Sequence, residues 1–589
     1  MRHLGSERLD PAGTVVALTP VAFEACRRAG LHPTVLDDHV QRPDFYLRPE
    51  PYIRWQLDWL RRLDQAIGGD GTVLACAQLI TVPITSVVVA ARMLSGAVDS
   101  TAPDGVRYVG ETGPEEESGY HNGHLQFWPL LGDQPLAARL LPVISDLRGL
   151  SYDTRSTIED HPSTISEGRP ILRQLRARFG QAVGPYRRAR FGSPLRHRGG
   201  TTLMLWYAGY GARRFDSDER RSGRRTVFFA RGGDSARLMD PTLPPRRPGG
   251  IPVDFSLPSA PPLSGSLADL LNEVDEWTQV TGAARILRRR LATFVHVICP
   301  VVARASVVIE AEYDRFGVDK VAAANSSSLE EFACLIAAGR KGIHRTLLQH
   351  GDHLFSYSSW LVNDTQNFDE LAASDPTIGS SLEVAAREIG ARAPSVTMYA
   401  PRINDLEARR TKISSRPAEH ADIVCYVPCM LTGDSNAIGG SYFDDSWYHR
   451  WHLRLLNVMA ARPGQRFIWK GLPAADQAVD PIPDLIYERG VSNVTYESRP
   501  FLSIVNDIDR VLLDFPSTAL YEAAHLGIPV LALSFSRFAA LRAPAAAMFA
   551  SVLRVCDTEE QGIRHLEDFL DDDPERWIVD LSALTEHAV

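Results

Sequence analysis

The chain has 589 residues, of which 44% are hydrophobic and 23% are charged. This balance is typical of a folded globular protein and excludes a fibrous or disordered chain. The length exceeds what one hydrophobic core usually supports, so we expect at least two domains. The net charge is −9, yet residues 151–250 contain 20 arginines and only 9 acidic residues. The basic region fits an anionic partner, such as a nucleotide, a phosphorylated lipid or an acidic glycan, or else a solvated arginine-rich surface.

The cysteines and the first residues favour a reducing compartment. The seven cysteines are scattered and form no Cys-x-x-Cys pair, which argues against a disulfide framework and a zinc ribbon. The N-terminal residues lack a basic stretch followed by an apolar core, so we expect no secretory signal. Residues 73–91 carry no charge, but polar residues and Pro83 interrupt them. We expect buried strand and helix pieces there rather than a membrane span, and a cytoplasmic protein.

The N-terminal part begins with the pattern of a β-α-β unit. Residues 14–19 and 33–36 are short apolar runs, and helical sequence lies between them as far as Gly30. Parallel strands joined by a helix imply a sheet that is covered on both faces. An amphipathic helix is expected over residues 52–67, and a connection rich in proline and glycine spans about residues 240–266.

A more regular α/β pattern begins near residue 320. An apolar strand over residues 320–324 precedes Ser328, whose spacing from Glu331 is that of a capping box at the start of a helix. The following strand, residues 345–348, carries at its carboxyl end Gln349, His350, Gly351 and Asp352. Ligands of open parallel sheets bind beyond the carboxyl ends of the strands, so these four residues are candidates for a functional site.

The C-terminal part repeats this pattern. Strands are expected over residues 422–427, 466–470, 510–514 and 529–533, and a helix over residues 517–526. We therefore predict two α/β domains that face each other across a cleft. The first comprises residues 1–405, with an arginine-rich insertion at about 151–266, and the second comprises residues 406–589. The crossing between them includes Arg402.

The start of the helix at residue 517 is a candidate anion site. Pro516 precedes Ser517 and Thr518 there, and unpaired N–H groups and the helix dipole favour a phosphate at such a helix start. Glu522 shares a helix face with Thr518 and would reach the ribose of a nucleotide whose phosphates lie at the turn. The alternative is a simple helix cap at Ser517, with Glu522 as a surface acid.

The segment 514–533, DFPSTALYEAAHLGIPVLAL, resembles the nucleotide-sugar-binding segment of GT-B glycosyltransferases. The pattern is most similar to the branch that includes CDP-glycerol glycerophosphotransferases, bacterial capsule and surface-polysaccharide transferases, and bacterial sialyl- and Kdo-transferases. These families show a serine pair and then a helix that ends in Gly-x-Pro, here Ser517-Thr518 and Gly527-Ile-Pro529. Residues 347–352, LLQHGD, are similar to their His-Gly motif. Residues 469–473, WKGLP, keep the lysine and proline of their Lys-x-His-Pro motif but lack the histidine.

The resemblance implies an α/β GT-B fold and a metal-independent transfer of a sugar or sugar-like group from a nucleotide-activated donor, with no further cofactor. The pathway would be surface-polysaccharide or secondary-metabolite biosynthesis. His350 or Asp352 would be the catalytic base. The donor nucleotide would be bound by Lys470, Ser517, Thr518 and Glu522. The residues that line the cleft would be Gln349, Gly351, Pro516 and Arg402.

The resemblance also implies the partners. The acceptor would be a glycan, a lipid-linked molecule or a small molecule, including an anionic one. We expect no nucleic acid partner, and peripheral contact with the inner face of the membrane is compatible with the prediction. Two alternatives stay open: an enzyme similar to UDP-sugar 2-epimerases, and a non-catalytic GT-B protein that binds nucleotides or glycans. The pairs Cys425/Cys429 and His449/His452 lack the further ligands of a metal site, and we expect packing or acceptor contacts for the histidines.

Overall fold

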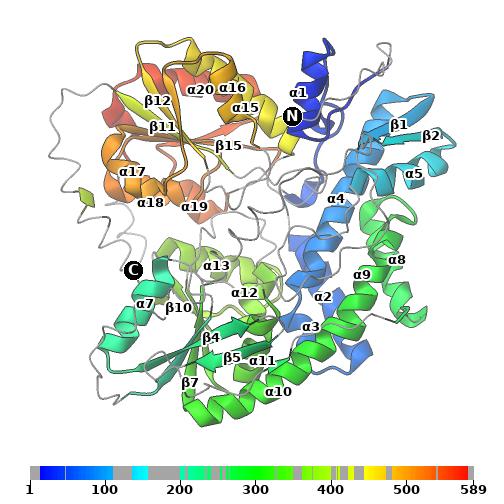
Figure 1. The fold of residues 1–589 in the computed structure, drawn as a ribbon, viewed down its shortest axis with the longest axis vertical. Helices are drawn as coiled ribbons and strands as arrows, with labels where there is room; N and C mark the ends of the chain where they lie inside the picture. Colours follow the sequence, from blue (N-terminus) through cyan, green and yellow to red (C-terminus); the bar gives the residue numbers. More distant parts are fainter. Residues whose placement is uncertain are drawn as a thin grey trace.

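The computed structural model describes residues 13–46, 48, 50–110, 136–156, 199–205, 210–232, 235–239, 253–254, 261–263, 265–324, 328–348, 361–373, 376–399, 406, 409–410, 422–429, 444–471, 480–538 and 541–580. Within this part of the chain, the strands form an eight-stranded sheet, a six-stranded sheet and a two-stranded sheet. The six-stranded sheet lies at the top of Figure 1 and the eight-stranded sheet at the bottom. The predicted class, α/β with two Rossmann-like sheets, is confirmed.

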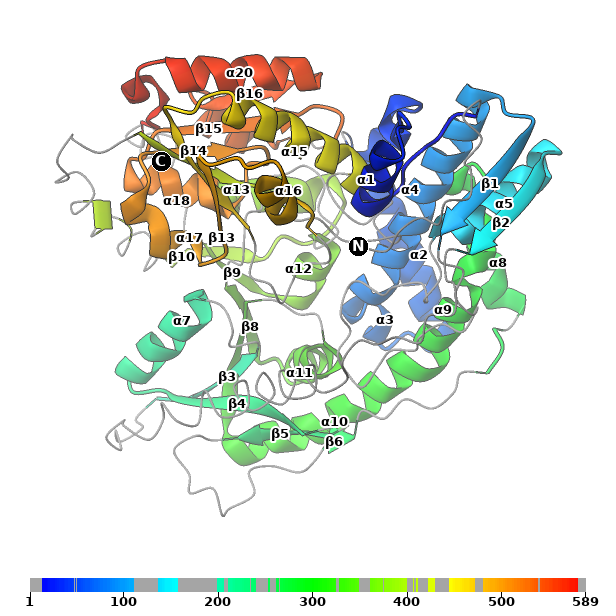
Figure 2. The same ribbon diagram turned by 45° about the horizontal axis from the view of Figure 1, so that its top comes forward.

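The N-terminal segment contains less strand than its sequence predicts. The expected β-α-β unit is reduced to one parallel bridge between Val16 and Thr34, with helix α1 (Pro20–Arg28) between the two residues. Figure 1 and Figure 2 both show α1 beside the six-stranded sheet rather than the eight-stranded one. There the Nε2 atom of His449 lies 3.1 Å from Oε1 of Glu24. The segment therefore packs against the C-terminal half of the chain. Short helices η1 (Leu36–Asp38) and η2 (Asp44–Tyr46) follow.

A largely helical region follows the N-terminal segment. Its helices are α2 (Glu50–Ile67), α3 (Thr72–Ala75), α4 (Gln78–Thr101) and α5 (Leu136–Arg148). Strands β1 (Gly105–Gly110) and β2 (Ser151–Ser156) form the two-stranded parallel sheet beside it. A second group comprises α8 (Gly265–Thr278), η3 (Ala283–Leu287), α9 (Arg288–Thr293), η4 (Phe294–Ile298) and α10 (Cys299–Phe316).

Helix α4 corrects the prediction of strand pieces in residues 73–91. Pro83 lies inside α4, where it removes one backbone N–H donor without ending the helix. By length and composition α4 could cross a membrane, as could Ala283–Phe316, but 89% of its most apolar window is buried by the rest of the protein. Its β-branched residues are therefore part of the core, which explains why its sequence has no polar face.

The eight-stranded sheet has the order β10-β9-β8-β7-β3-β4-β5-β6. Its strands are β3 (Thr201–Leu205), β4 (Arg225–Gly232), β5 (Ser235–Met239), β6 (Val253–Asp254), β7 (Val318–Ala323), β8 (His344–Leu348), β9 (Glu370–Ala373) and β10 (Ser395–Met398). The strands from β10 to β4 are parallel, and β5 and β6 continue the sheet in antiparallel pairs. Its helices are α7 (Tyr210–Arg221), α11 (Leu329–Arg340), α12 (Leu361–Asn367) and α13 (Pro376–Glu388).

The capping box predicted before α11 is confirmed. The backbone N–H of Ser328 donates to Oε2 of Glu331 at 2.9 Å, and the N–H of Glu331 donates to Oγ of Ser328 at 3.3 Å. Lys341 and Gly342, with φ of 64° at the glycine, end the helix and lead into β8. The strand that was expected to carry residues 349–352 is therefore present.

The six-stranded sheet is parallel throughout and has the order β13-β12-β11-β14-β15-β16. Its strands are β11 (Ile423–Val427), β12 (Arg466–Lys470), β13 (Val494–Glu497), β14 (Arg510–Leu513), β15 (Val530–Phe535) and β16 (Leu553–Cys556). In chain order this is 3-2-1-4-5-6, the order of a doubly wound nucleotide-binding sheet. The helices around it are α15 (Asp445–Ala460), α16 (Ile482–Glu488), α17 (Phe501–Ile504), η6 (Val505–Asp507), α18 (Thr518–Leu526), α19 (Ala543–Met548), α20 (Glu559–Asp571) and η7 (Pro574–Trp577).

The helices cover both faces of this sheet. Helices α15 and α20 pack together on one face, and α18 and α19 lie on the other (Figure 1). Helix α13 of the eight-stranded sheet packs against α19, so these two helices connect the two halves of the molecule.

The domain boundary near residue 405 stays a prediction. The last strand of the first sheet ends at Met398 and the first strand of the second begins at Ile423. The arginine-rich region at about 151–266 is described only in part. Its described segments supply β2 to the two-stranded sheet and β3 to β6 to the eight-stranded sheet, and its role as an insertion stays a prediction.

Candidate functional site

The strand order of the six-stranded sheet identifies the edge where a ligand is expected. The chain moves outward from β11 in one direction through β12 and β13, and in the other direction through β14, β15 and β16. The crevice at such a switch point, outside the carboxyl ends of the strands, is the usual ligand site of an open parallel sheet. Here the switch point lies between β11 and β14.

The turn after β14 leads directly into α18 at this switch point. Ser517 is the N-cap of α18, and its Oγ accepts a hydrogen bond from the N–H of Ala519 at 3.4 Å. Pro516 is buried, whereas Ser517 and Thr518 are half-buried. The predicted residues Pro516, Ser517 and Thr518 therefore lie together at the carboxyl edge of the sheet. Glu522 is buried one turn further along α18, so it is not the surface acid of the alternative interpretation.

Asp514 begins this turn and lies at the centre of a buried hydrogen-bond network. Its Oδ1 accepts from the Tyr448 hydroxyl at 2.9 Å, and its Oδ2 accepts from Nε1 of Trp451 at 3.0 Å. The hydroxyl of Tyr426 also donates to Oδ2. The network joins the end of β14 to β11, which carries Tyr426, and to α15, which carries Tyr448 and Trp451. All four side chains are fully buried.

Burial controls the protonation of this network. Removal from water raises the pKa of Asp514 to about 6, although the hydrogen bonds from Tyr426, Tyr448 and Trp451 act in the opposite direction. Burial also holds the pKa of His452 well below its ordinary value, and the nearby His449 adds to this effect. The Nε2 atom of His452 lies 3.9 Å from Oδ2 of Asp514. At neutral pH the network therefore contains an ionised carboxylate beside a neutral imidazole.

Lys470 lies at the end of β12, which is separated from β14 by one strand. The residue is buried, and its ammonium group donates to the carbonyl of Gly471. Burial lowers its pKa, against the effect of the neighbouring Cys425 and Glu497. Strand β11 lies between β12 and β14, and adjacent strands are ~4.8 Å apart, so Lys470 starts roughly 10 Å from the turn. The structure brings Pro516, Ser517 and Thr518 together, and Lys470 lies apart from them.

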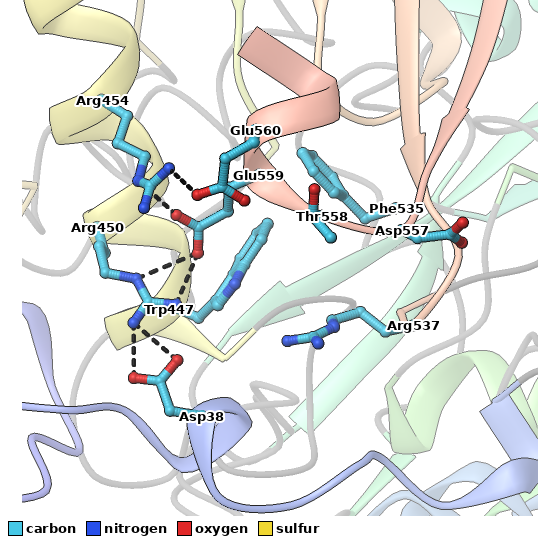
Figure 3. Close-up of a pocket in the computed structure, with 10 residues that line it drawn as sticks. All are labelled: Asp38, Trp447, Arg450, Arg454, Phe535, Arg537, Asp557, Thr558, Glu559 and Glu560. Carbon is cyan, nitrogen blue, oxygen red and sulfur yellow. Dashed lines mark hydrogen bonds and ion pairs between the residues drawn. The ribbon is translucent and has the colours of Figure 1, made fainter. Parts of the chain in front are cut away.

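A pocket of about 290 Å³ opens at the same edge of the sheet, at the ends of β15 and β16 (Figure 3). It is lined by Trp447, Arg450 and Arg454 of α15, by Phe535 and Arg537 at the end of β15, by Asp557, Thr558, Glu559 and Glu560 at the start of α20, and by Asp38. The residues of α20 and of β15 thus face the first turns of α15.

The charged side chains of the pocket are mostly paired with one another. Arg450 contacts Oδ2 of Asp38 and Oε1 of Glu559, both at 2.6 Å. Arg454 contacts Glu559 at 2.7 Å and Glu560 at 2.6 Å. Arg537 instead extends toward the middle of the group in Figure 3, and its Nη1 donates to the backbone oxygen of Asp37 at 3.3 Å. Three arginines face four carboxylates, so the pocket is polar and nearly balanced in charge.

Several predicted site residues lie outside the described residues. These are the catalytic candidates His350 and Asp352 and the cleft candidates Gln349, Gly351 and Arg402. Strand β8 ends at Leu348, directly before the first of them. Their roles stay predictions.

Of the histidine and cysteine pairs noted in the sequence, all members but the half-buried Cys429 lie in the core. His449 and His452 are both buried on α15, and the ring of His452 lies 4.0 Å from that of Tyr448 and 5.0 Å from that of Trp469. Cys425 is buried in β11. Within the described ranges, no group of three or more histidine, cysteine or acidic residues is arranged to hold a metal ion.

The sequence did not single out the hydrogen-bond network around Asp514. One signal was available, because Asp514 is an acidic residue that directly follows an apolar strand and begins the turn to a helix. Tyr448, Trp451 and His452 also share one face of a helix by their spacing. Their meeting at one carboxylate depends on the pairing of β11 with β14, which only the fold shows.

Comparisons with known proteins add similarities of fold alone. No known protein family and no curated protein matches the chain. Among solved structures, Acinetobacter baumannii MurG is similar with a TM-score of 0.36 and 11% identity, over 64% of this chain and 92% of that chain. Medicago truncatula UGT71G1 complexed with UDP-glucose has a TM-score of 0.34 and 10% identity, over 67% and 94%. The spinosyn rhamnosyltransferase SpnG complexed with thymidine diphosphate has a TM-score of 0.31 and 13% identity, over 66% and 95%. The strand orders of the two sheets, and not these similarities, establish the fold described above.

Proposed function

We propose that the chain is a GT-B glycosyltransferase that transfers a sugar or sugar-like group from a nucleotide-activated donor to an acceptor hydroxyl. One observation carries this proposal: the turn Pro516 to Thr518 and the start of α18 lie at the switch point of a sheet with the order 3-2-1-4-5-6. The N–H groups at such a helix start attract the phosphates of a nucleotide. A cytoplasmic location and an acceptor in surface-polysaccharide or secondary-metabolite assembly are part of the proposal.

In this proposal the donor diphosphate binds at the start of α18. The helix N–H groups and the hydroxyls of Ser517 and Thr518 stabilise the negative charge that develops as the diphosphate leaves. Glu522 lies on the same helix face and would accept hydrogen bonds from the ribose. Lys470 reaches the phosphates only if its ammonium turns away from the carbonyl of Gly471, so we assign it a secondary role.

The acceptor must lose a proton during the transfer. The bond between the donor sugar and the diphosphate breaks, a bond to the acceptor oxygen forms, and the acceptor proton passes to a base. We propose His350 or Asp352 as that base, because both lie within a few residues of the carboxyl end of β8, which ends at Leu348. A histidine has the pKa that suits this step at neutral pH.

The pocket at the ends of β15 and β16 fits a sugar better than a nucleotide. Its volume of about 290 Å³ lies at the lower limit of small-molecule pockets, which span roughly 300–1,000 Å³. Its paired carboxylates and guanidinium groups suit an uncharged molecule with many hydroxyl groups. We therefore assign this pocket to the transferred group and the turn after β14 to the diphosphate.

Calorimetric titration with UDP, dTDP, CDP and CMP tests the nucleotide site. We expect the protein to bind at least one of them, and the double variant Ser517→Ala, Glu522→Ala to bind it at least tenfold more weakly. Thr19→Ala is the matched control, because it removes a hydroxyl that caps α1, where Oγ1 accepts from the N–H of Ala22 at 3.1 Å. Binding of none of the four, or equal binding by the double variant, would show that the site is assigned wrongly.

Turnover assays separate this proposal from its alternatives. An epimerase converts a nucleotide sugar without any acceptor, whereas a transferase requires one. A non-catalytic binding protein shows no turnover in either case. We expect that His350→Ala and Asp352→Ala still bind the nucleotide and that one of them loses transfer.

A further inference from the structure

The network around Asp514 connects the two turns that border the switch point. On one side, Asp514 directly follows β14 and begins the turn that leads to Ser517 and α18. On the other side, Cys429 lies two residues after the end of β11, and its backbone N–H donates to the hydroxyl of Tyr448 at 2.5 Å. The same hydroxyl donates to Oδ1 of Asp514 at 2.9 Å. One tyrosine hydroxyl thus joins the backbone after β11 to the residue that begins the turn after β14.

We propose that Asp514 is a positioning residue of the donor site, and that it acts through Tyr448 to hold the backbone after β11 at a fixed distance from the turn before α18. This inference rests on the proposed function, because it assigns a role to Asp514 in binding the donor nucleotide. Asp514 does not touch the ligand, since its side chain is completely buried.

The hydrogen bonds of the network indicate that Asp514 fixes the positions of the elements around it rather than only filling space between them. An ionised carboxylate in the core is costly unless it is hydrogen-bonded, and an apolar side chain would fill the same space without that cost. Asp514 instead accepts hydrogen bonds from three side-chain donors, on β11 and on α15, and the backbone N–H of Cys429 also favours its ionised form. Hydrogen bonds have narrow ranges of distance and angle, so they fix the register of these elements more closely than apolar contacts do.

The position of the two turns matters for a phosphate site built from backbone N–H groups. Such donors are effective only when they already lie at hydrogen-bonding distance from the oxygens they stabilise. A displacement of about 1 Å can reduce the effect roughly a hundredfold. A network that holds both turns therefore acts on nucleotide affinity without any direct contact.

The variant Tyr448→Phe tests the inference, because it keeps the ring and removes the hydroxyl that links Cys429 to Asp514. Tyr313→Phe is the matched control. Tyr313 is also a buried tyrosine, and its hydroxyl donates to the carbonyl of Cys334 at 2.8 Å, on helices of the other half of the molecule. We expect Tyr448→Phe to weaken binding of the nucleotide that the unaltered protein prefers among UDP, dTDP, CDP and CMP by at least tenfold. Tyr313→Phe should bind it within twofold of the unaltered protein.

Alkylation of Cys429 provides a second readout that a general loss of stability would not produce. Cys429 is half-buried, whereas the other six cysteines are buried, so iodoacetamide should modify Cys429 first. In Tyr448→Phe the rate at Cys429 should rise severalfold, and the other six should stay protected. In the unaltered protein, bound nucleotide should slow the reaction at Cys429.

A pair of substitutions at Asp514 completes the test. In Asp514→Asn the side-chain oxygen still accepts from Trp451 and the new amide donates to the hydroxyl of Tyr448, so nucleotide binding should stay within threefold. Asp514→Leu leaves the donors without an acceptor and should weaken binding at least as much as Tyr448→Phe. The inference is overturned if the protein binds a nucleotide and Tyr448→Phe binds it equally well with unchanged alkylation. If the unaltered protein binds none of the four nucleotides, the proposed function fails as well.

Discussion

The replacement Asp514→Asn makes a quantitative prediction about stability and pH. Asp514 is completely buried, and its pKa of about 6 in the fold lies above its ordinary value of 3.8. The folded protein therefore holds this proton more tightly than the unfolded chain does. The stabilisation that the bound proton of Asp514 gives to the fold is complete below pH 3.8 and is lost as the pH rises through 6. Between pH 8 and pH 5 the contribution grows by about 1 kcal/mol, as linkage gives for a carboxyl group whose pKa is raised to about 6.

Urea unfolding followed by tryptophan fluorescence at several pH values between 5 and 8 measures this contribution. Asparagine does not titrate, whereas every other ionisable group is present in both proteins. The difference in the free energy of unfolding, unaltered protein minus Asp514→Asn, should therefore be about 1 kcal/mol larger at pH 5 than at pH 8. A difference that does not change with pH, or that becomes smaller at pH 5, would refute the raised pKa and the burial of this carboxylate.

Three further predictions concern the packing of the N-terminal segment, the end of α18 and the acceptor. His449→Leu removes the 3.1 Å hydrogen-bond partner of the buried Glu24 carboxylate, which keeps only the contact with Arg27 at 3.4 Å, and should lower the free energy of unfolding by ~1–2 kcal/mol, measured by urea unfolding. Gly527→Ala places a side chain at φ of 67°, with its Cβ 3.0 Å from Nε of Arg410, and should cost at least ~1 kcal/mol in the same assay. If the arginine-rich region binds an anionic acceptor, the transfer rate at low acceptor concentration should fall as KCl rises from 50 to 500 mM, because salt screens exposed charges. An unchanged stability in either variant, or a rate independent of salt, would contradict the corresponding statement.

The C-terminal sheet shows how much of the fold its sequence predicts. The strands β14 and β15, the helix between them and its end at Gly527 follow from an apolar run, a serine cap and a glycine with positive φ, all of which are local signals. For residues 73–91 the burial and the helix are confirmed, but the expected strand pieces are wrong, because the β-branched residues and Pro83 of α4 resemble strand sequence. Since nearly every residue of α4 is buried, its sequence has no polar face to reveal the helix.

Part of the candidate site was predictable because its signals are local in the sequence. Ser517 and Thr518 lie at the helix start that the sequence indicates, because a cap is a local feature. The burial of Lys470 and the meeting of Tyr426 with Asp514 depend on which strands are neighbours in the sheet. Residues far apart in the sequence form these contacts, so no local pattern in the sequence indicates them.

A crystal structure of the protein soaked with UDP or dTDP tests the central claim most directly. The account predicts the diphosphate at the start of α18, within hydrogen-bonding distance of the N–H groups and hydroxyls of Ser517 and Thr518, with the ribose beside Glu522. A diphosphate bound elsewhere, for example against Arg537 in the pocket at the ends of β15 and β16, would contradict it.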